Sequence, residues 1–188
     1  MARIPYPDPA TVPDDVHTLI AAFPPLNIFR MLVHAETLVR GFGQLGAAIL
    51  GRAALDARLR ELVILRVGAR SPAAYEWQQH VPIARAVGAT DDEIAALERD
   101  DPDAPSFGAR ERALLHLTDE LLVTPRASDA TLAAMRGQFS DRELCEAVLT
   151  IGYYMMVARF LETTGVDLEA GSADAVTAMV ARLRRDPA

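Results

Sequence analysis

The chain has 188 residues and a mass of 20.4 kDa, enough to build one hydrophobic core or at most two small ones. Hydrophobic residues make up 51% and charged residues 24% of the sequence, which excludes a disordered chain, a collagen and a disulfide-stapled miniprotein. The 19 basic and 26 acidic residues give a net charge of −7, so we expect no nucleic-acid partner.

The ends and the apolar stretches predict a soluble, cytoplasmic protein. The longest nearly apolar stretch, residues 147–158, is shorter than the roughly twenty residues that cross a bilayer, so we expect no membrane segment. The N-terminal residues lack the apolar core of a secretory signal. The single cysteine, Cys145, cannot form an internal disulfide.

The first fifty residues predict an arm and two helices. Residues 1–13 contain four prolines, which favours an extended arm without a regular element. Apolar residues at helical spacing predict a short helix over residues 14–23. A second helix is expected over residues 27–51, with a bend or break near Gly41 and Gly43.

Residues 55–69 predict the most apolar helix of the first half, because apolar side chains cover most of its circumference. The β-branched content of residues 62–67 also allows a strand, but no turn flanks this segment and no second strand offers to pair with it. Glu61 and Arg66 are polar residues that such a helix would bury.

Capping residues mark the helices that follow. Residues 71–88 predict a helix with Ser71 as its N-cap and a glycine at its end. Capping boxes, in which Ser or Thr precedes Glu by three residues, begin at Thr90 and Ser140. The acidic, proline-containing segment 100–105 between them is the best candidate for a linker between similar halves.

The rest of the chain is also helical by pattern. The expected helices are residues 109–123, 128–139 and 141–164, with a weaker one at 173–185. No strand is predicted anywhere, so we expect an all-α bundle of eight or nine helices. The tripeptide Arg-Glu-Leu at residues 60–62 recurs at 142–144, which is compatible with an internal duplication.

One predicted helix carries a cluster that could transfer protons. Glu76 and His80 lie one turn apart on the same face as Trp77. A carboxylate beside an imidazole can work as a general acid and base near neutral pH. The alternative is an ordinary surface pair beside a half-buried tryptophan.

Glu61 requires a partner, because an unpaired carboxylate in an apolar helix would cost several kcal/mol. The candidates are Arg58 and Arg66 on the same helix and His80 on the next one, so a structural ion pair remains open. Other polar residues fall inside apolar patterns and would line a pocket or fill the core: His34, His116, Tyr153 and Tyr154.

No cofactor is expected from the motifs. Glu76 and His80 could supply two metal ligands, but no second pair of this spacing and no cysteine cluster would complete the site. The sequence also lacks the glycine-rich loops of dinucleotide and nucleoside triphosphate sites and the nucleophile motif of serine hydrolases.

The segments 61–68, 75–80 and 84–94 resemble the core of the carboxymuconolactone decarboxylase family, whose superfamily includes the alkyl hydroperoxidase D proteins. The resemblance covers most of the chain from about residue 25 to residue 168. It implies an alkyl hydroperoxidase D-like helical domain over 25–170, preceded by an arm and short helix (1–24) and followed by a C-terminal helix or tail (171–188).

The peroxidase branch of this superfamily has a glutamate followed by Cys-x-x-Cys-x-x-x-His. Glu61 and His80 match the glutamate and histidine in register, but the cysteine positions hold Ala73 and Glu76. Peroxidase chemistry of that type is therefore excluded, because both the attacking and the resolving sulfur are missing. Cys145 matches neither position.

The resemblance therefore implies the decarboxylase-type branch, with lyase or isomerase chemistry on a small carboxylated, lactone-like substrate. His80 and Glu76 would transfer protons, and Glu61 would orient His80. Arg66 or Arg159 would bind a substrate carboxylate. The remaining expected substrate-binding residues are His34, Tyr75, Trp77, Tyr153 and Tyr154.

The resemblance also implies a homo-oligomer, either a trimer or a hexamer. A degenerate relative that keeps the fold as a non-catalytic binding or scaffold protein is the main alternative. Peroxide reduction through Cys145 is a third hypothesis.

Overall fold

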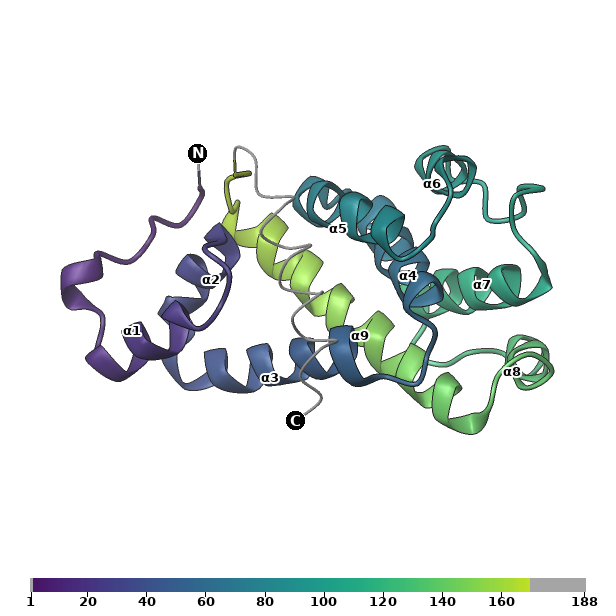
Figure 1. Ribbon diagram of the computed structural model, residues 1–188, viewed down its shortest axis with the longest axis horizontal. Coiled ribbons are helices and arrows are strands. Elements are labelled where there is room, and N and C mark those ends of the chain that lie inside the picture. Colours follow the sequence, from purple (N-terminus) through teal and green to yellow (C-terminus); the bar gives the residue numbers. More distant parts are fainter. Residues whose placement is uncertain (1, 170–188) are drawn as a thin grey trace. The chain divides into compact units, whose positions relative to one another are not determined.

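The computed structural model describes residues 2–169, and in that part of the chain all regular structure is helical (Figure 1). These residues form nine α-helices and two 3-10 helices. The all-α prediction is confirmed. The alternative strand over 62–67 is wrong, because this segment lies inside helix α4 (Ala57–Arg70). The helix predicted over 173–185 lies outside the described residues.

The chain forms two compact units. Among the described residues, the first comprises 2–52 and 160–169, and the second comprises 53–159. The predicted linker, residues 100–105, does not separate them. It lies inside the second unit, between α6 (Asp91–Glu98) and α7 (Ala109–Val123).

The N-terminal arm of the first unit is more ordered than predicted. A 3-10 helix (Pro9–Thr11) interrupts it, because the Asp8 side chain accepts a hydrogen bond from the Ala10 amide and caps the turn. The arm is held at its start by the carbonyl of Thr164, which accepts bonds from the amides of Arg3 (2.8 Å) and Ile4 (3.1 Å).

The helices of the first unit are α1 (Asp14–Ala21), α2 (Asn27–Leu32) and α3 (Glu36–Arg52), with a 3-10 helix (Val33–Ala35) between the last two. The predicted break therefore exists but lies at Val33–Ala35, and its expected place at Gly41 and Gly43 is wrong. Both glycines continue α3. A Cβ at Gly43 would collide with the ring of Phe23, so this glycine permits close packing instead of a bend.

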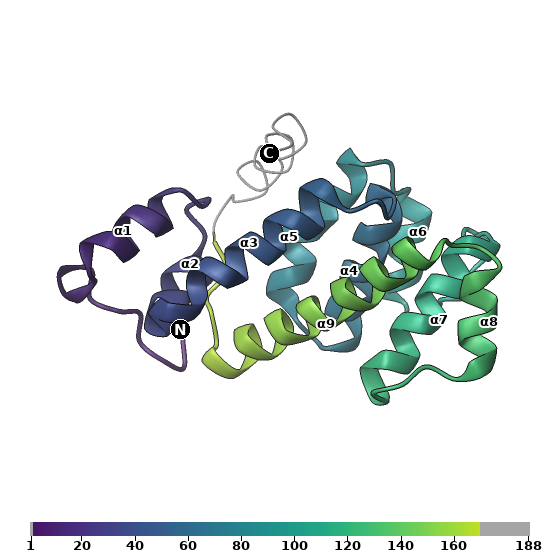
Figure 2. The ribbon, with the colours of Figure 1, turned by 90° about the horizontal axis from the view of Figure 1, so that it is seen from below.

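The second unit is built around α4. This helix packs against α5 (Ala74–Ala86), α6 and α7. Every residue from Leu59 to Gly68 is buried, as the apolar circumference of the segment predicts. Figure 2 shows α7 beside α8 (Asp129–Arg136), which packs against it.

Local capping explains most helix ends in this unit. Asp56 caps α4, and both predicted capping boxes form, at Thr90 and at Ser140. Gly88, at φ +101°, follows the end of α5 as expected. The prediction of Ser71 as the N-cap of α5 is wrong. Its amide bonds the carbonyl of Val67, so Ser71 completes the last turn of α4.

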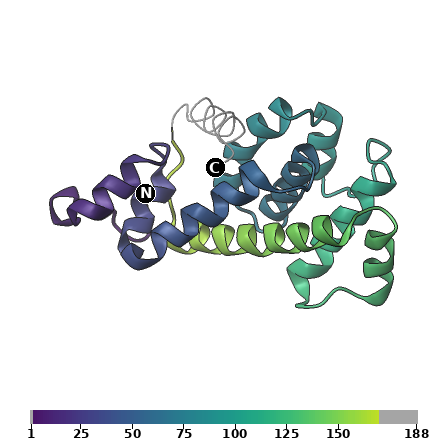
Figure 3. The same cartoon turned by 60° about the horizontal axis from the view of Figure 1, so that its bottom comes forward.

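Helix α9 (Asp141–Thr164) runs as one unbroken helix (Figure 3). It is the one helix in residues 2–169 that is long and apolar enough to cross a membrane by length and composition alone, with a mean hydropathy of 1.4. One face, which includes Ala147, Ile151 and Ala158, is buried in the protein. A core helix of a soluble protein passes the same test, so this feature alone does not indicate a membrane protein.

Candidate functional site

Helices α4 and α5 pack against each other (Figure 1). Their packing brings together Glu61 and His80, the two residues that matched the family motif. The Oε2 atom of Glu61 accepts a hydrogen bond from Nδ1 of His80 at 2.8 Å. Glu61 is fully buried, and His80 is 8% exposed. An ionised carboxylate only accepts hydrogen bonds, so the neutral imidazole carries its proton on Nδ1 and keeps the lone pair on Nε2.

Arg60 completes the cluster and was not among the expected partners of Glu61. Its Nε and Nη2 atoms lie 3.1 Å and 2.9 Å from Oε1 of Glu61. The side chain is only 3% exposed. Adjacent residues on a helix do not normally face each other, which is why the pair was missed. The sequence did contain a signal for Arg60, because it is a third polar residue, after Glu61 and Arg66, in a helix without a polar face.

The other arginines considered for Glu61 have different partners. Arg58 forms ion pairs with Glu93 and Glu111. Arg66 contacts Asp119 through Nε (2.6 Å) and Nη2 (2.7 Å). Its Nη1 lies 2.6 Å from Asp100, which also pairs with Arg70 at 2.9 Å.

Charges around Glu61 keep it ionised. Burial alone would favour the neutral acid, but the charge and hydrogen bond of His80, and then those of Arg60, outweigh it. The pKa of Glu61 is therefore held below its ordinary value.

This lowered pKa predicts a loss of stability in acid. Because the unfolded chain binds the Glu61 proton at higher pH than the folded chain, the stabilisation is complete above the ordinary pKa of 4.5 and is lost as the pH falls through the lower folded value. Other carboxylates also make the stability depend on pH, so the effect of Glu61 is measured as a difference in unfolding free energy between two proteins. In urea unfolding at pH 7 and at about pH 3.5, we expect the stability advantage of wild type over Glu61→Gln to shrink in acid. An advantage that is constant or grows in acid would contradict the assignment.

Two tyrosines of α9 border the cluster. The ring of Tyr154 meets the ring of His80 edge to face, with centroids 5.1 Å apart, and Tyr153 packs on Tyr154 at 5.3 Å. Burial, and then the nearby charge of Glu61, raises the pKa of Tyr154 well above its ordinary value. Burial and the charge of Glu76 likewise raise the pKa of Tyr153. Both phenols therefore keep their protons at neutral pH and can donate hydrogen bonds.

The other expected site residues on α5 are Tyr75, Glu76 and Trp77. Glu76 lies one turn before His80 and is 2% exposed, and its charge acts on Tyr153 and Tyr154. Tyr75 is buried, and Trp77 is half-buried. Glu61, from the neighbouring helix, is the carboxylate that bonds Nδ1 of His80.

The two arginines expected to bind a substrate carboxylate have protein partners. Arg66 is buried between Asp119 and Asp100, where it ties α4 to α7 and to the segment that precedes it. Arg159 is exposed on α9 and donates a hydrogen bond to the carbonyl of Met155 at 2.8 Å. Neither has a hydrogen bond to Glu61 or His80 among the contacts of the described residues.

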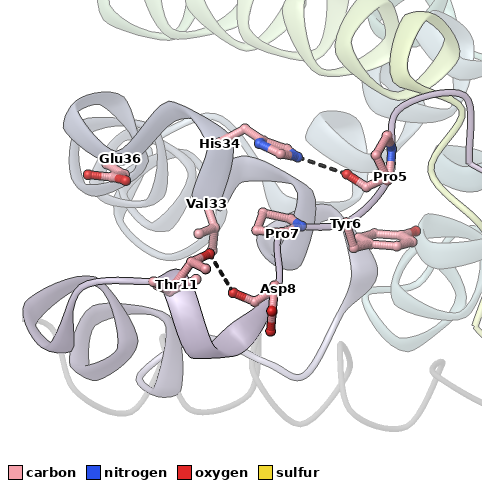
Figure 4. Close-up of a pocket in the computed structure, with 9 residues that line it drawn as sticks. Pro5, Tyr6, Pro7, Asp8, Thr11, Val33, His34 and Glu36 are labelled. Atoms are coloured by element: carbon pink, nitrogen blue, oxygen red, sulfur yellow. Dashed lines mark hydrogen bonds between the residues drawn. The ribbon is translucent and has the colours of Figure 1, made fainter.

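His34 and His116 are exposed, so the alternative that they fill the core is wrong. His116 pairs with Asp103 at 2.9 Å. His34 belongs to the first unit and donates from Nε2 to the carbonyl of Pro5 at 2.8 Å. It lines a cavity of about 350 Å³ between the arm and the Val33–Ala35 turn (Figure 4). The other polar residues of that lining are Tyr6, Asp8, Thr11 and Glu36.

Within residues 2–169, no group of three or more His, Cys, Asp or Glu side chains could hold a metal ion. Cys145 is an exposed free thiol on α9. The polar cluster around the two motif residues consists of Arg60, Glu61 and His80, with Tyr154 against the imidazole.

Part of the chain matches a known protein family. Residues 36–120 match the model of the carboxymuconolactone decarboxylase family, a range that contains both Glu61 and His80. Over this range the chain is similar to the carboxymuconolactone decarboxylase family. Among curated proteins, none matches the chain significantly.

Several solved structures share the fold. An uncharacterized peroxidase-related protein from Ralstonia eutropha JMP134, an alkylhydroperoxidase AhpD core, is 20% identical with a TM-score of 0.78, over 94% of this chain and 96% of its own. A peroxidase-related protein from Silicibacter sp. TM1040 is 18% identical with a TM-score of 0.74, over 93% and 94%. The debrominase Bmp8 is 14% identical with a TM-score of 0.72, over 96% and 97%. These likenesses confirm the alkyl hydroperoxidase D-like helical fold.

Proposed function

We propose that this protein is a cofactor-free small-molecule enzyme of the carboxymuconolactone decarboxylase type, which uses His80 to transfer protons. The observation that carries the proposal is the buried hydrogen bond of 2.8 Å between Oε2 of Glu61 and Nδ1 of His80. A carboxylate in this position orients the imidazole and stabilises its protonated form, as in other acid–base sites. The substrate would be a small carboxylated, lactone-like acid.

The reaction requires mainly an acid that is held next to the substrate. When the carbon–carbon bond to the carboxylate breaks, carbon dioxide leaves and the electron pair moves onto a conjugated carbonyl. Protonated His80 then delivers a proton from Nε2 to the product carbon and regains one from solvent. In an isomerisation, the same atom would take a proton from one carbon and return it to another. Glu76 is the second proposed proton carrier, and the phenol of Tyr154 would donate to the developing oxyanion.

A structural neighbour supports a small organic substrate. The debrominase Bmp8 was solved with 2,3,4-tribromopyrrole in a variant whose cysteine is replaced by alanine. The fold therefore accommodates a small ring compound in at least one protein. The thiol positions of the peroxidase motif hold Ala73 and Glu76 here, so we carry over only the size and class of ligand.

We also propose where the enzyme acts, in which oligomeric state and with which partners. The family resemblance supports a cytoplasmic homo-oligomer, either a trimer or a hexamer. This oligomer would act on a small molecule and would bind neither nucleic acid nor a membrane. Arg159, exposed on α9, is the better remaining candidate for binding a substrate carboxylate, because the guanidinium of Arg66 already has two carboxylate partners.

Release of carbon dioxide from carboxymuconolactone tests the proposal. We expect the purified protein to release carbon dioxide and to consume the lactone, and we expect Cys145→Ser to do so at the wild-type rate because the mechanism uses no sulfur. Loss of activity in Cys145→Ser would instead indicate a thiol mechanism. A wild-type protein that leaves the lactone intact would rule out the decarboxylase assignment and favour the binding or scaffold alternative.

A further inference from the structure

The contact between Arg60 and Glu61 differs from the usual pairing of an arginine with a carboxylate. A guanidinium commonly donates two parallel hydrogen bonds, one to each carboxylate oxygen. Here both Nε and Nη2 of Arg60 reach the same atom, Oε1 of Glu61, at 3.1 Å and 2.9 Å. The second oxygen, Oε2, is therefore left to His80 at 2.8 Å.

We propose that Arg60 is a positioning residue that reserves Oε2 of Glu61 for His80 and, through its positive charge, makes protonated His80 release its proton more readily. This inference rests on the proposed function only in assigning proton transfer to Nε2 of His80. Arg60 acts through Glu61 and is not itself a catalytic residue.

The charge balance of the cluster supports the second part. Arginine stays protonated at all relevant pH values, and Glu61 is ionised. With neutral His80 the three side chains carry no net charge, and with protonated His80 they carry one positive charge in a site where Arg60 and Glu61 are almost fully buried. The positive charge of Arg60 opposes a second positive charge on His80, so Arg60 shifts the balance toward the neutral imidazole whatever the charge of Glu76. Without Arg60, protonation of His80 would neutralise the pair.

The other groups near His80 do not replace this effect. Within residues 2–169, the charged and titratable side chains around His80 and its neighbour Tyr154 are Arg60 and Glu61 from α4, Glu76 from α5, and Tyr153 and Tyr154 from α9. The tyrosines stay neutral at the relevant pH, since their pKa values are raised. Glu76 is negative and acts in the opposite direction, so among these residues Arg60 is the one whose charge favours neutral His80.

A titration of the His80 ring by NMR tests the proposal without any substrate. The histidines are labelled with ¹⁵N, and the His80 signal is assigned by its absence from His80→Gln. In Arg60→Met, we expect the His80 ring to keep its second proton to a pH about one unit higher than in wild type. Arg60→Lys keeps the positive charge and should titrate close to wild type.

The control is Arg58→Met, which removes a different arginine from the same helix. Arg58 pairs with Glu93 and Glu111 and has no part in the cluster, so its loss should leave the His80 titration unchanged. Should Arg60→Met not fold, Arg60→Gln offers a neutral side chain that can still donate to Oε1, and its comparison with Arg60→Lys isolates the charge.

The proposal is overturned if the neutral Arg60 variant that folds, whether Met or Gln, titrates like wild type, or if Arg58→Met moves the titration as far. Its failure is separable from that of the proposed function. The titration reads the protonation of His80 directly, whereas the proposed function depends on carbon dioxide release and on its loss in His80→Gln.

Discussion

Replacing His80 with glutamine is expected to lower the turnover of carboxymuconolactone by about 10²–10⁴-fold. Glutamine has a similar length and offers an N–H group to Oε2 of Glu61, so the fold should survive. It has no group that can give or take a proton near neutral pH, so the proton-transfer step should fail. Initial rates of carbon dioxide release at saturating substrate measure the effect, and circular dichroism checks the fold.

The matched control is His116→Gln. His116 is also a histidine hydrogen-bonded to a carboxylate, that of Asp103, but it is exposed. Its replacement should leave turnover and stability near wild type. A His80→Gln protein with wild-type turnover, or an equal loss in His116→Gln, would remove His80 from the mechanism.

Replacing Glu61 with leucine is expected to destabilise the protein by about 3–5 kcal/mol. Leucine fits an apolar helix, but it removes the anion beside Arg60, which is almost fully buried, and the acceptor of the His80 Nδ1 proton. Urea unfolding at pH 7 measures the loss. The double variant Arg60→Met/Glu61→Leu should recover part of it, because both charges then leave the interior together.

Glu143→Ala provides the comparison for this second prediction. Glu143 follows an arginine and precedes a leucine, as Glu61 does, but it belongs to the capping box at the start of α9. Its loss should cost about 1 kcal/mol, the usual value of a helix cap. If Glu61→Leu costs no more than Glu143→Ala, the buried cluster does not stabilise the fold as its geometry indicates.

These two glutamates also show why a repeated tripeptide does not repeat a contact. Arg60 donates to Glu61 within its own tripeptide, whereas Arg142 donates to Glu146, one turn further along the helix. Burial explains the difference. Arg60 is only 3% exposed and pairs with the carboxylate of the adjacent Glu61. Arg142 is exposed and pairs with Glu146, four residues further along the helix, which is a favourable spacing.

Local pattern determined a large part of this protein. The bounds of α7 and α9 follow from apolar spacing, and the capping box at Ser140 also marks the start of α9. Burial of α4 around its whole circumference follows from composition alone. The match of Glu61 and His80 to the family motif also needed only the linear spacing of residues.

Only the tertiary structure decided which charged groups meet. Arg58, Arg66 and His80 were all compatible with Glu61 along the sequence, and packing of α4 on α5 selected His80. Arg60 entered the cluster against the rule for adjacent helical residues. A helix's periodicity and caps depend on neighbours a few residues away, so they can be read from sequence. The partner of a long buried side chain depends on what neighbouring helices leave within its reach, which no local pattern contains.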